Sequence, residues 1–272
     1  MSKTDKEKAY LYDLYIVPTW RETYDTVFNE QVGLPKEGRI LVVNCGTGGH
    51  SLELAASVAS KGDIVASSSD EEKLELGRAK AQIQHVSNIS FDLGEPPALD
   101  YDADTFDMVV GDATMMMLSY DIEELVNEMV RVAKSGATIV LQLATRGSFD
   151  EFFSIYWEAL HECGLEEFFQ DVESLITERL SAPDAEALLK HAGLKKMKTV
   201  QKRREFVFDD AEQFLTSPII EDVFFDTWME VLPDSGTADK VRHSIGKIID
   251  RERKGQKFDV SIKATTIWGT KE

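Results

Sequence analysis

One feature of the sequence constrains the fold of this chain most. It is an apolar run that ends at a glycine-rich corner and is followed by a helical pattern. Residues 39–43 are apolar after Arg39, the corner 44–49 holds three glycines, and residues 52–58 carry apolar side chains at helical spacing. A buried strand that turns at glycines into a helix is the opening unit of a doubly wound sheet. The sequence therefore predicts an α/β fold with helices on both faces of a mostly parallel sheet.

Further strand and helix patterns follow at the spacing of this fold. Apolar runs predict strands over 63–67, 89–91, 105–110 and 137–143. Asp70 is expected to cap a helix through Ile83, and Asp121 is expected to cap an amphipathic helix that ends at Ser135-Gly136. Residues 10–31 are expected to form two short helices divided at Pro18, after a frayed start at 1–9.

The second half of the chain is richer in helical patterns. Helices are predicted over 149–163 and 183–192, and strands over 197–208 and 258–268. Residues 210–232 and 238–253 are interpreted as a helical insertion. We therefore expect an N-terminal helical segment (1–38), an α/β core (39–148), and a C-terminal part of the same domain with the insertion and the closing strands (149–272).

Charge and cysteine usage exclude several classes of function. The chain has 30 Lys and Arg against 49 Asp and Glu, so its net charge is −19. Such a surface repels phosphate backbones, which argues against a nucleic-acid substrate. Two cysteines give no disulfide framework, so a cytoplasmic location is expected, and the five histidines lack the spacing of metal ligands. Residues 1–8 do not read as a signal peptide, and no apolar run is long enough to span a membrane.

Four short motifs carry a resemblance to a known family. They are Leu41-Val42-Val43-Asn44-Cys45-Gly46-Thr47-Gly48, Leu74-Glu75-Leu76-Gly77-Arg78-Ala79, Thr105-Phe106-Asp107-Met108-Val109-Val110 and Met129-Val130-Arg131-Val132-Ala133-Lys134-Ser135-Gly136. In this order and spacing the chain resembles the class I S-adenosylmethionine-dependent methyltransferases, in particular small-molecule enzymes of the ubiquinone-biosynthesis type. The resemblance covers nearly the whole chain. It implies a seven-stranded, Rossmann-like sheet with an antiparallel last strand, and S-adenosylmethionine as the cofactor.

The chain departs from the cofactor motif of that family at three positions. The family reads acid-x-Gly-x-Gly-x-Gly, whereas Val42 stands at the acid and Asn44 at the first glycine. The acid that binds both ribose hydroxyls after the second strand falls at Ser68. A neutral hydrogen bond contributes about 1 kcal/mol against roughly 1.5–3 for a charged one. The cofactor site is therefore expected to be weakened by roughly ten- to a thousandfold.

The resemblance assigns the remaining cofactor contacts residue by residue. Glu95 falls where the family contacts the adenine amino group, and Gly111 and Asp112 fall at the methionine end. The expected cofactor-binding residues are Asn44, Gly46, Thr47, Gly48, Ser68, Glu95, Gly111 and Asp112. Glu95 and Asp112 also fit an ordinary loop or capping role.

Methyl transfer from a sulfonium needs alignment and exclusion of water more than a catalytic triad. Should a base be required, His50 and Asp112 are the nearest candidates by sequence, although a histidine at the start of a helix more often packs. Met115 to Leu118 and the aromatic residues of 149–157 and 214–228 fit either a core or the lining for an apolar or aromatic acceptor. The helical insertion fits a substrate cover or a homodimer face.

Three hypotheses stay open at this point. The first is a methyltransferase that acts on a small, apolar or aromatic acceptor. The second is a methyltransferase-fold protein that has lost cofactor binding and serves as a non-catalytic subunit or scaffold, which the three departures favour. The third is an NADP-dependent oxidoreductase, because serines follow the second strand. The basic stretch Lys195 to Arg204 fits a solvated strand edge or a contact with an acidic partner.

Overall fold

A computed structural model of the chain describes residues 3–35, 37–58, 61–94, 96–97, 99–116, 118–253 and 256–272. Contacts within the chain define two compact units. Unit 1 comprises 1–144, 182–201 and 264–272, and unit 2 comprises 145–181 and 202–263. The domain boundaries expected from the sequence stay a prediction.

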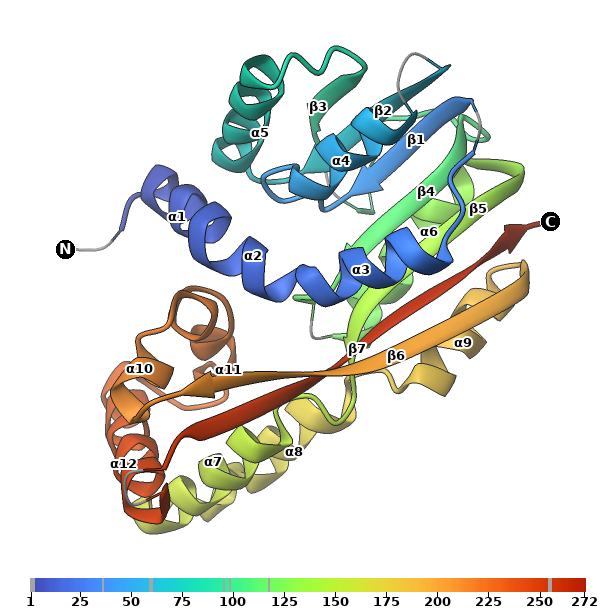
Figure 1. The fold of residues 1–272 in the computed structure, drawn as a ribbon. Coiled ribbons are helices and arrows are strands. Elements are labelled where there is room, and N and C mark those ends of the chain that lie inside the picture. Colours follow the sequence, from blue (N-terminus) through green and yellow to red (C-terminus); the bar gives the residue numbers. More distant parts are fainter. Residues whose placement is uncertain are drawn as a thin grey trace. The chain divides into compact units, whose positions relative to one another are not determined.

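A seven-stranded sheet organises the fold, with the strand order β3-β2-β1-β4-β5-β7-β6. The strands are β1 (Gly38–Val43), β2 (Gly62–Ser68), β3 (Ile89–Leu93), β4 (Phe106–Ala113), β5 (Ala133–Thr145), β6 (Leu194–Phe208) and β7 (Phe258–Lys271). The pairs β3–β2, β2–β1, β1–β4 and β4–β5 are parallel, whereas the arrows of β6 and β7 point in opposite directions (Figure 1). The predicted mostly parallel, seven-stranded α/β fold is confirmed.

The helices of unit 1 follow the predicted pattern except at the N-terminus. They are α1 (Asp5–Leu11), η1 (Tyr12–Ile16, a π-helix), α2 (Val17–Trp20), α3 (Glu22–Gln31), α4 (Gly49–Val58), α5 (Glu71–Ile83), α6 (Ser119–Val132) and α9 (Ala182–His191). The expectation that the first nine residues fray is wrong for α1, because Thr4 and Glu7 form a capping box that starts this helix. Pro18 lies in the first turn of α2, where no N–H is needed. The segment predicted to form two helices is instead built from four consecutive helical pieces, α1, η1, α2 and α3.

One predicted helix cap is confirmed and another is wrong. The Asp70 side chain accepts a hydrogen bond from the Lys73 amide and caps α5 as expected. By contrast, α6 begins at Ser119 after an extended Leu118, so Asp121 lies inside the first turn. The predicted helix end at Ser135-Gly136 is also wrong, because Ala133 already pairs with Phe106 and β5 starts there, ahead of a register shift.

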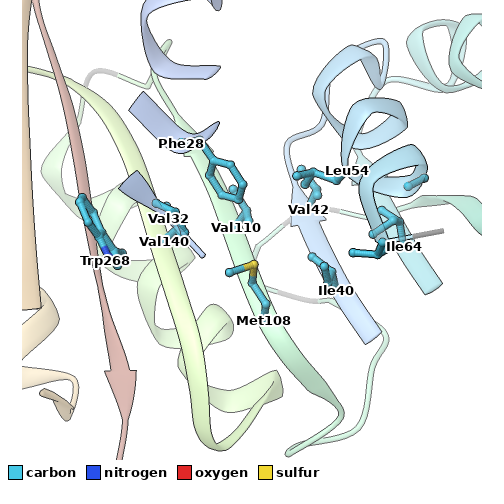
Figure 2. Packing of buried hydrophobic residues seen from close by; sticks show 12 residues of the cluster. Phe28, Val32, Ile40, Val42, Leu54, Ile64, Met108, Val110, Val140 and Trp268 are labelled. Atoms are coloured by element: carbon cyan, nitrogen blue, oxygen red, sulfur yellow. The ribbon is translucent and has the colours of Figure 1, made fainter. Parts of the chain in front are cut away.

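A hydrophobic cluster fills one face of the sheet in unit 1 (Figure 2). Its buried members are Phe28, Val32, Ile40, Val42, Leu54, Ala55, Val58, Ile64, Met108, Val110, Val140 and Trp268. Val42 is only 3% exposed within this cluster. A carboxylate at that position would be buried among apolar groups, so the departure from the family's acid fits the packing of this chain.

Unit 2 has an aromatic core of its own. Its helices are α7 (Asp150–Cys163), η3 (Glu166–Phe168), α8 (Phe169–Thr177), α10 (Ala211–Leu215), η4 (Ile220–Phe224), α11 (Phe225–Met229) and α12 (Ser235–Arg253). Phe152 stacks on Trp228 with ring centroids 4.2 Å apart, and Phe149, Phe153 and Phe224 surround the same indole. These rings are fully buried, so they form core.

Candidate functional site

The corner between β1 and α4 is a tight glycine loop. Asn44, Gly46 and Gly48 all have positive φ angles, of 58°, 56° and 73°. A side chain on Gly48 would come within 2.5 Å of the Phe91 ring of β3. A side chain on Gly46 would come within 2.7 Å of the Tyr12 hydroxyl oxygen. Gly48 is thus required by its packing against Phe91, and Gly46 is required by its packing against Tyr12.

A cavity of about 220 Å³ lies beside this loop, at the carboxyl ends of the parallel strands β1, β2 and β4. Its lining residues are Tyr12, Asn44, Gly46, Ser68, Ser69, Asp70, Lys73, Asp112, Met115 and Met116. Ligands of open α/β sheets bind at this edge. Four of the predicted cofactor-binding residues, Asn44, Gly46, Ser68 and Asp112, therefore line one cavity.

The other predicted site residues lie elsewhere or outside the described residues. Thr47 and His50 line a smaller cavity of about 20 Å³, together with Tyr12, Arg21, Asp112 and Gln142. That volume is enough for a single water molecule. A side chain on Gly111 would meet the Met129 sulfur at 2.4 Å, so this glycine allows α6 to pack on β4. Glu95 lies outside the described residues, and its role, like that of Gly48 and Gly111, stays a prediction.

The N-terminal π-helix supplies site residues that the sequence analysis missed. The Tyr12 ring lines both cavities, and the Lys73 ammonium lies 4.6 Å from its centroid. Asp13 accepts a hydrogen bond from the Thr47 hydroxyl and forms an ion pair with Lys80 of α5 at 2.6 Å. A contact between residues so far apart in the chain leaves no trace in local spacing, so no sequence pattern marks it.

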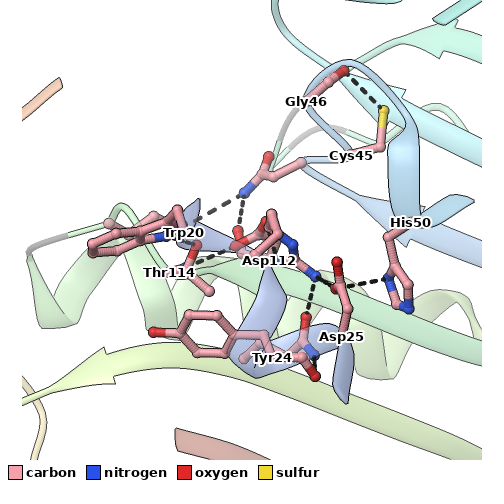
Figure 3. A network of polar contacts seen from close by, with 12 residues as sticks. Trp20, Tyr24, Asp25, Cys45, Gly46, His50, Asp112 and Thr114 are labelled. Atoms are coloured by element: carbon pink, nitrogen blue, oxygen red, sulfur yellow. Dashed lines mark hydrogen bonds and ion pairs between the residues drawn. The ribbon is translucent and has the colours of Figure 1, made fainter. Parts of the chain in front are cut away.

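A buried polar network surrounds Asp112 (Figure 3). Arg21 donates to Asp112 at 2.5 Å and to Asp25 and Gln142 at 2.7 Å each. Burial opposes the charge on Arg21, but the two carboxylates outweigh it and raise the pKa of the guanidinium. The Asn44 amide donates to the Asp112 carbonyl at 3.0 Å, which ties the glycine loop to β4.

His50 lies at the edge of this network, beside Asp25, and makes no hydrogen bond to it (Figure 3). Its ring packs edge-on against Phe28, with centroids 4.7 Å apart, and is 8% exposed. Neither ring nitrogen has a hydrogen-bond partner in the described part of the chain, and the Asp25 carboxylate lies 3.9 Å from Nδ1. Burial and then the charge of Arg21 lower the pKa of His50 to about 3. The imidazole is therefore neutral at physiological pH, and a role for it or for Asp112 as a base stays a prediction.

The Ser68 hydroxyl is buried and takes part in the start of α5. Its oxygen accepts a hydrogen bond from the Asp70 amide at 3.2 Å. Asp70 in turn accepts from the Lys73 amide at 3.1 Å, and its other carboxylate oxygen lies 3.2 Å from the Lys73 ammonium. The carboxyl end of β2 thus presents a serine and an aspartate to the cavity.

None of the helices in the described ranges combines the length and the apolar character needed to cross a bilayer. The basic stretch of β6 lies on an outer strand of the sheet, and Lys195, Lys196 and Lys198 are largely solvent-accessible there. This position fits the solvated-edge interpretation. A contact with an acidic partner stays a prediction.

Comparison with known proteins agrees with this geometry. The family model described as "Methyltransferase domain" matches residues 34–179, which is more than half of the chain. A demethylmenaquinone methyltransferase from Shouchella clausii is 32% identical over 139 residues, covering 51% of this chain and 57% of the relative. Ajmaline N-methyltransferase from Rauvolfia serpentina is 36% identical over 106 residues, covering 39% of this chain and 36% of the relative. The matches thus span less than two thirds of these relatives.

Solved structures share the fold over most of the chain. The YcgJ protein of Bacillus subtilis superposes with a TM-score of 0.59 at 16% identity, covering 92% of this chain and 99% of that one. Phosphoethanolamine N-methyltransferase 2 of Haemonchus contortus, solved with S-adenosyl-L-methionine, gives a TM-score of 0.58 at 12% identity. The match covers 98% of this chain and 57% of that one. The family match shows that the chain belongs to the methyltransferase-domain family, and the sheet order and the solved structures show that it has the fold of these neighbours.

Proposed function

We propose that this protein is an S-adenosylmethionine-dependent methyltransferase that acts on a small, apolar or aromatic acceptor. The observation that carries the proposal is the cavity of about 220 Å³, where Asn44, Gly46, Ser68 and Asp112 meet at the carboxyl edge of the sheet. Family membership supports the reaction type, and the relatives named above methylate small molecules according to their names.

The residues around the cavity suit an adenosyl cofactor. Gly46 lets another group approach the loop backbone closely, and in this structure that group is the Tyr12 side chain, which a Cβ on Gly46 would meet at 2.7 Å. Ser68 and Asp70 offer polar groups at the end of β2, and Asp112 does so at the end of β4. Small-molecule pockets usually have about 300–1,000 Å³. The cavity is smaller than that, so we expect Tyr12 or the methionines to shift when ligand enters.

The bound cofactor would supply an activated methyl group on a positively charged sulfur. The protein would then contribute orientation and exclusion of water. Arg21 holds the Asp112 carboxylate and is itself held by Asp25 and Gln142, so this carboxylate is oriented without a ligand. Met115 and Met116 give the same cavity an adaptable apolar wall, which favours an apolar or aromatic acceptor over a charged one.

Titration calorimetry with S-adenosylmethionine, S-adenosylhomocysteine and NADPH tests the proposal. Micromolar binding of the first two, with no binding of NADPH, is the expected result. Methyl transfer to a panel of hydroxylated aromatics, amines and quinols would then identify the acceptor class. Absence of heat with both sulfur-containing ligands at millimolar concentration would contradict the enzymatic proposal.

A scaffold without cofactor binding is the second candidate. It is favoured by Val42, which is buried in the core cluster, and by Ser68, whose oxygen is already engaged by the Asp70 amide. The Ser68→Asp variant separates the two candidates. If the cavity holds the ribose, Ser68→Asp changes the affinity for S-adenosylhomocysteine, because it replaces a neutral group of the lining with a carboxylate. A scaffold would show no binding before or after the change.

A further inference from the structure

Asp70 lies next to the position where the family's ribose-binding acid is missing. Its carboxylate lines the cavity of about 220 Å³ together with Ser68. The two residues are joined directly, because the Asp70 amide donates to the Ser68 hydroxyl oxygen at 3.2 Å. A negative charge is therefore present at this end of the cavity, two residues further along the chain than the family pattern places it.

The carboxylate of Asp70 has acceptor capacity to spare. An ionised carboxylate offers about four acceptor sites. The Lys73 amide occupies a site on Oδ1 at 3.1 Å, and the Lys73 ammonium lies 3.2 Å from Oδ2. Each oxygen thus keeps one acceptor site. The Ser68 oxygen accepts from the Asp70 amide, which leaves the hydroxyl proton of Ser68 free to be donated.

We propose that Asp70 is the carboxylate that binds the two ribose hydroxyls of the cofactor, with Ser68 as an accompanying donor. Two acceptor sites on one carboxylate match two neighbouring hydroxyl groups, and charge-assisted hydrogen bonds are the strong ones. The assignment rests on the proposed function and deepens it. In this chain the departure at Ser68 relocates the charge of the ribose site and does not remove it.

The capping role of Asp70 must be separated from a role in binding. Asparagine caps helices about as well as aspartate does. Asp70→Asn therefore keeps the start of α5 and removes only the charge. Asp210 gives a matched control, because it caps α10 of unit 2 through the Gln213 amide at 2.8 Å and does not line the cavity.

The experiment is calorimetry on the full-length chain with S-adenosylhomocysteine, adenosine and 2′,3′-dideoxyadenosine. Asp70→Asn is expected to weaken S-adenosylhomocysteine binding by about tenfold or more, and Asp210→Asn to leave it unchanged. The wild type should prefer adenosine to the dideoxy analogue, and Asp70→Asn should lose most of that preference. A capping role alone would not change the preference between two nucleosides.

The outcomes distinguish the assignment from the proposed function. If the wild type binds S-adenosylhomocysteine and Asp70→Asn binds it equally well, or keeps its full preference for adenosine, only the Asp70 assignment is wrong. If the wild type does not bind, the proposed function and the assignment are both overturned. Adding Ser68→Asp to Asp70→Asn should restore the affinity, because it returns a carboxylate to the end of β2.

Discussion

The two ends of the cavity differ in how completely their polar groups are already paired. At the β4 end, Asp112 is held by Arg21 and by the Thr114 amide, and Arg21 is shared with Asp25 and Gln142. At the β2 end, the Ser68 side chain accepts from the Asp70 amide and the Asp70 side chain contacts Lys73, so these partners are near neighbours in sequence. The first end is fixed before a ligand binds, whereas the second keeps acceptor sites open. We therefore expect the fold to tolerate substitutions at the β2 end better than substitutions at the β4 end.

The largest effect is expected from Arg21→Ala, which tests how firmly the β4 end is fixed. The change leaves the partly buried carboxylates of Asp112 and Asp25 without their cation. Removal of one partner of a buried ion pair costs about 3–5 kcal/mol. Urea denaturation followed by circular dichroism should report a loss of this size. Arg251 also contacts two carboxylates, those of Glu158 and Glu162, but is exposed, so Arg251→Ala should change stability little. Equal losses of stability in the two variants would mean that burial of the Arg21 network contributes nothing to the stability of the fold.

His50 makes the same end sensitive to acid. Its pKa is about 3 in the folded chain, because of burial and the nearby Arg21, against an ordinary value of about 6.5 in the unfolded chain. Between these values the unfolded state binds one proton more, so stability falls as the pH decreases below 6.5. The slope from this group is about 1.4 kcal/mol per pH unit. His50→Gln should lack this part of the slope when unfolding is measured from pH 6.5 to 4.5. His161→Gln, at a site whose side chain is 73% exposed, should keep it.

Gly46→Ala tests the loop that lies between the two ends. The alanine backbone would have to keep a φ of 56°, and its Cβ would come within 2.7 Å of the Tyr12 hydroxyl oxygen. We expect a loss of stability of about 2 kcal/mol. Gly164→Ala is the matched control, because its φ is 69° but nothing lies within 4 Å of the added carbon. If both variants lose the same amount, the contact with Tyr12 is irrelevant. Tyr12→Phe should recover part of the loss at Gly46 and none at Gly164.

The smallest effect is expected at the ion pair that joins the N-terminal π-helix to α5. Asp13→Ala and Lys80→Ala should each lower stability by about 1 kcal/mol or less, because both side chains are partly exposed. A double-mutant cycle should give a coupling energy of about 0.5 kcal/mol. Hydrogen exchange of residues 5–20 should accelerate in both variants. Exchange that stays at the wild-type rate would show that other contacts hold this segment.

Much of the fold could be predicted from local patterns. The apolar runs before Gly46 and before Asp112 predict buried parallel strands, and the Asp70 cap fixes the start of α5. The errors arose where tertiary pairing overrides a local signal. Ser135-Gly136 looks like the end of a helix, but Ala133 pairs with Phe106 and the chain is already in β5. Asp121 is a good capping residue by type, yet the extended backbone of Leu118 starts α6 earlier.

The site could be predicted only in part, for a physical reason. Asn44, Gly46, Ser68 and Asp112 each end a strand or follow one, so parallel pairing brings them together at one edge. Tyr12 and Asp13 come from η1 and Arg21 from the turn between α2 and α3, all ahead of the sheet in the chain. Their position depends on packing between elements far apart in the chain. The resemblance placed the ribose acid at Ser68, and only the geometry brought Asp70 into consideration.

The path of the backbone through the two units limits how this protein can be divided. The chain leaves one unit for the other at residues 144–145, 181–182, 201–202 and 263–264, and β6 and β7 each contribute residues to both. A truncated chain that stops after unit 1's first stretch would lack the two strands that complete one side of the sheet. Isolating either unit as a fragment would thus require joining stretches that are not consecutive in the chain. Because the last fourteen residues belong partly to each unit, their loss should disturb both units at once.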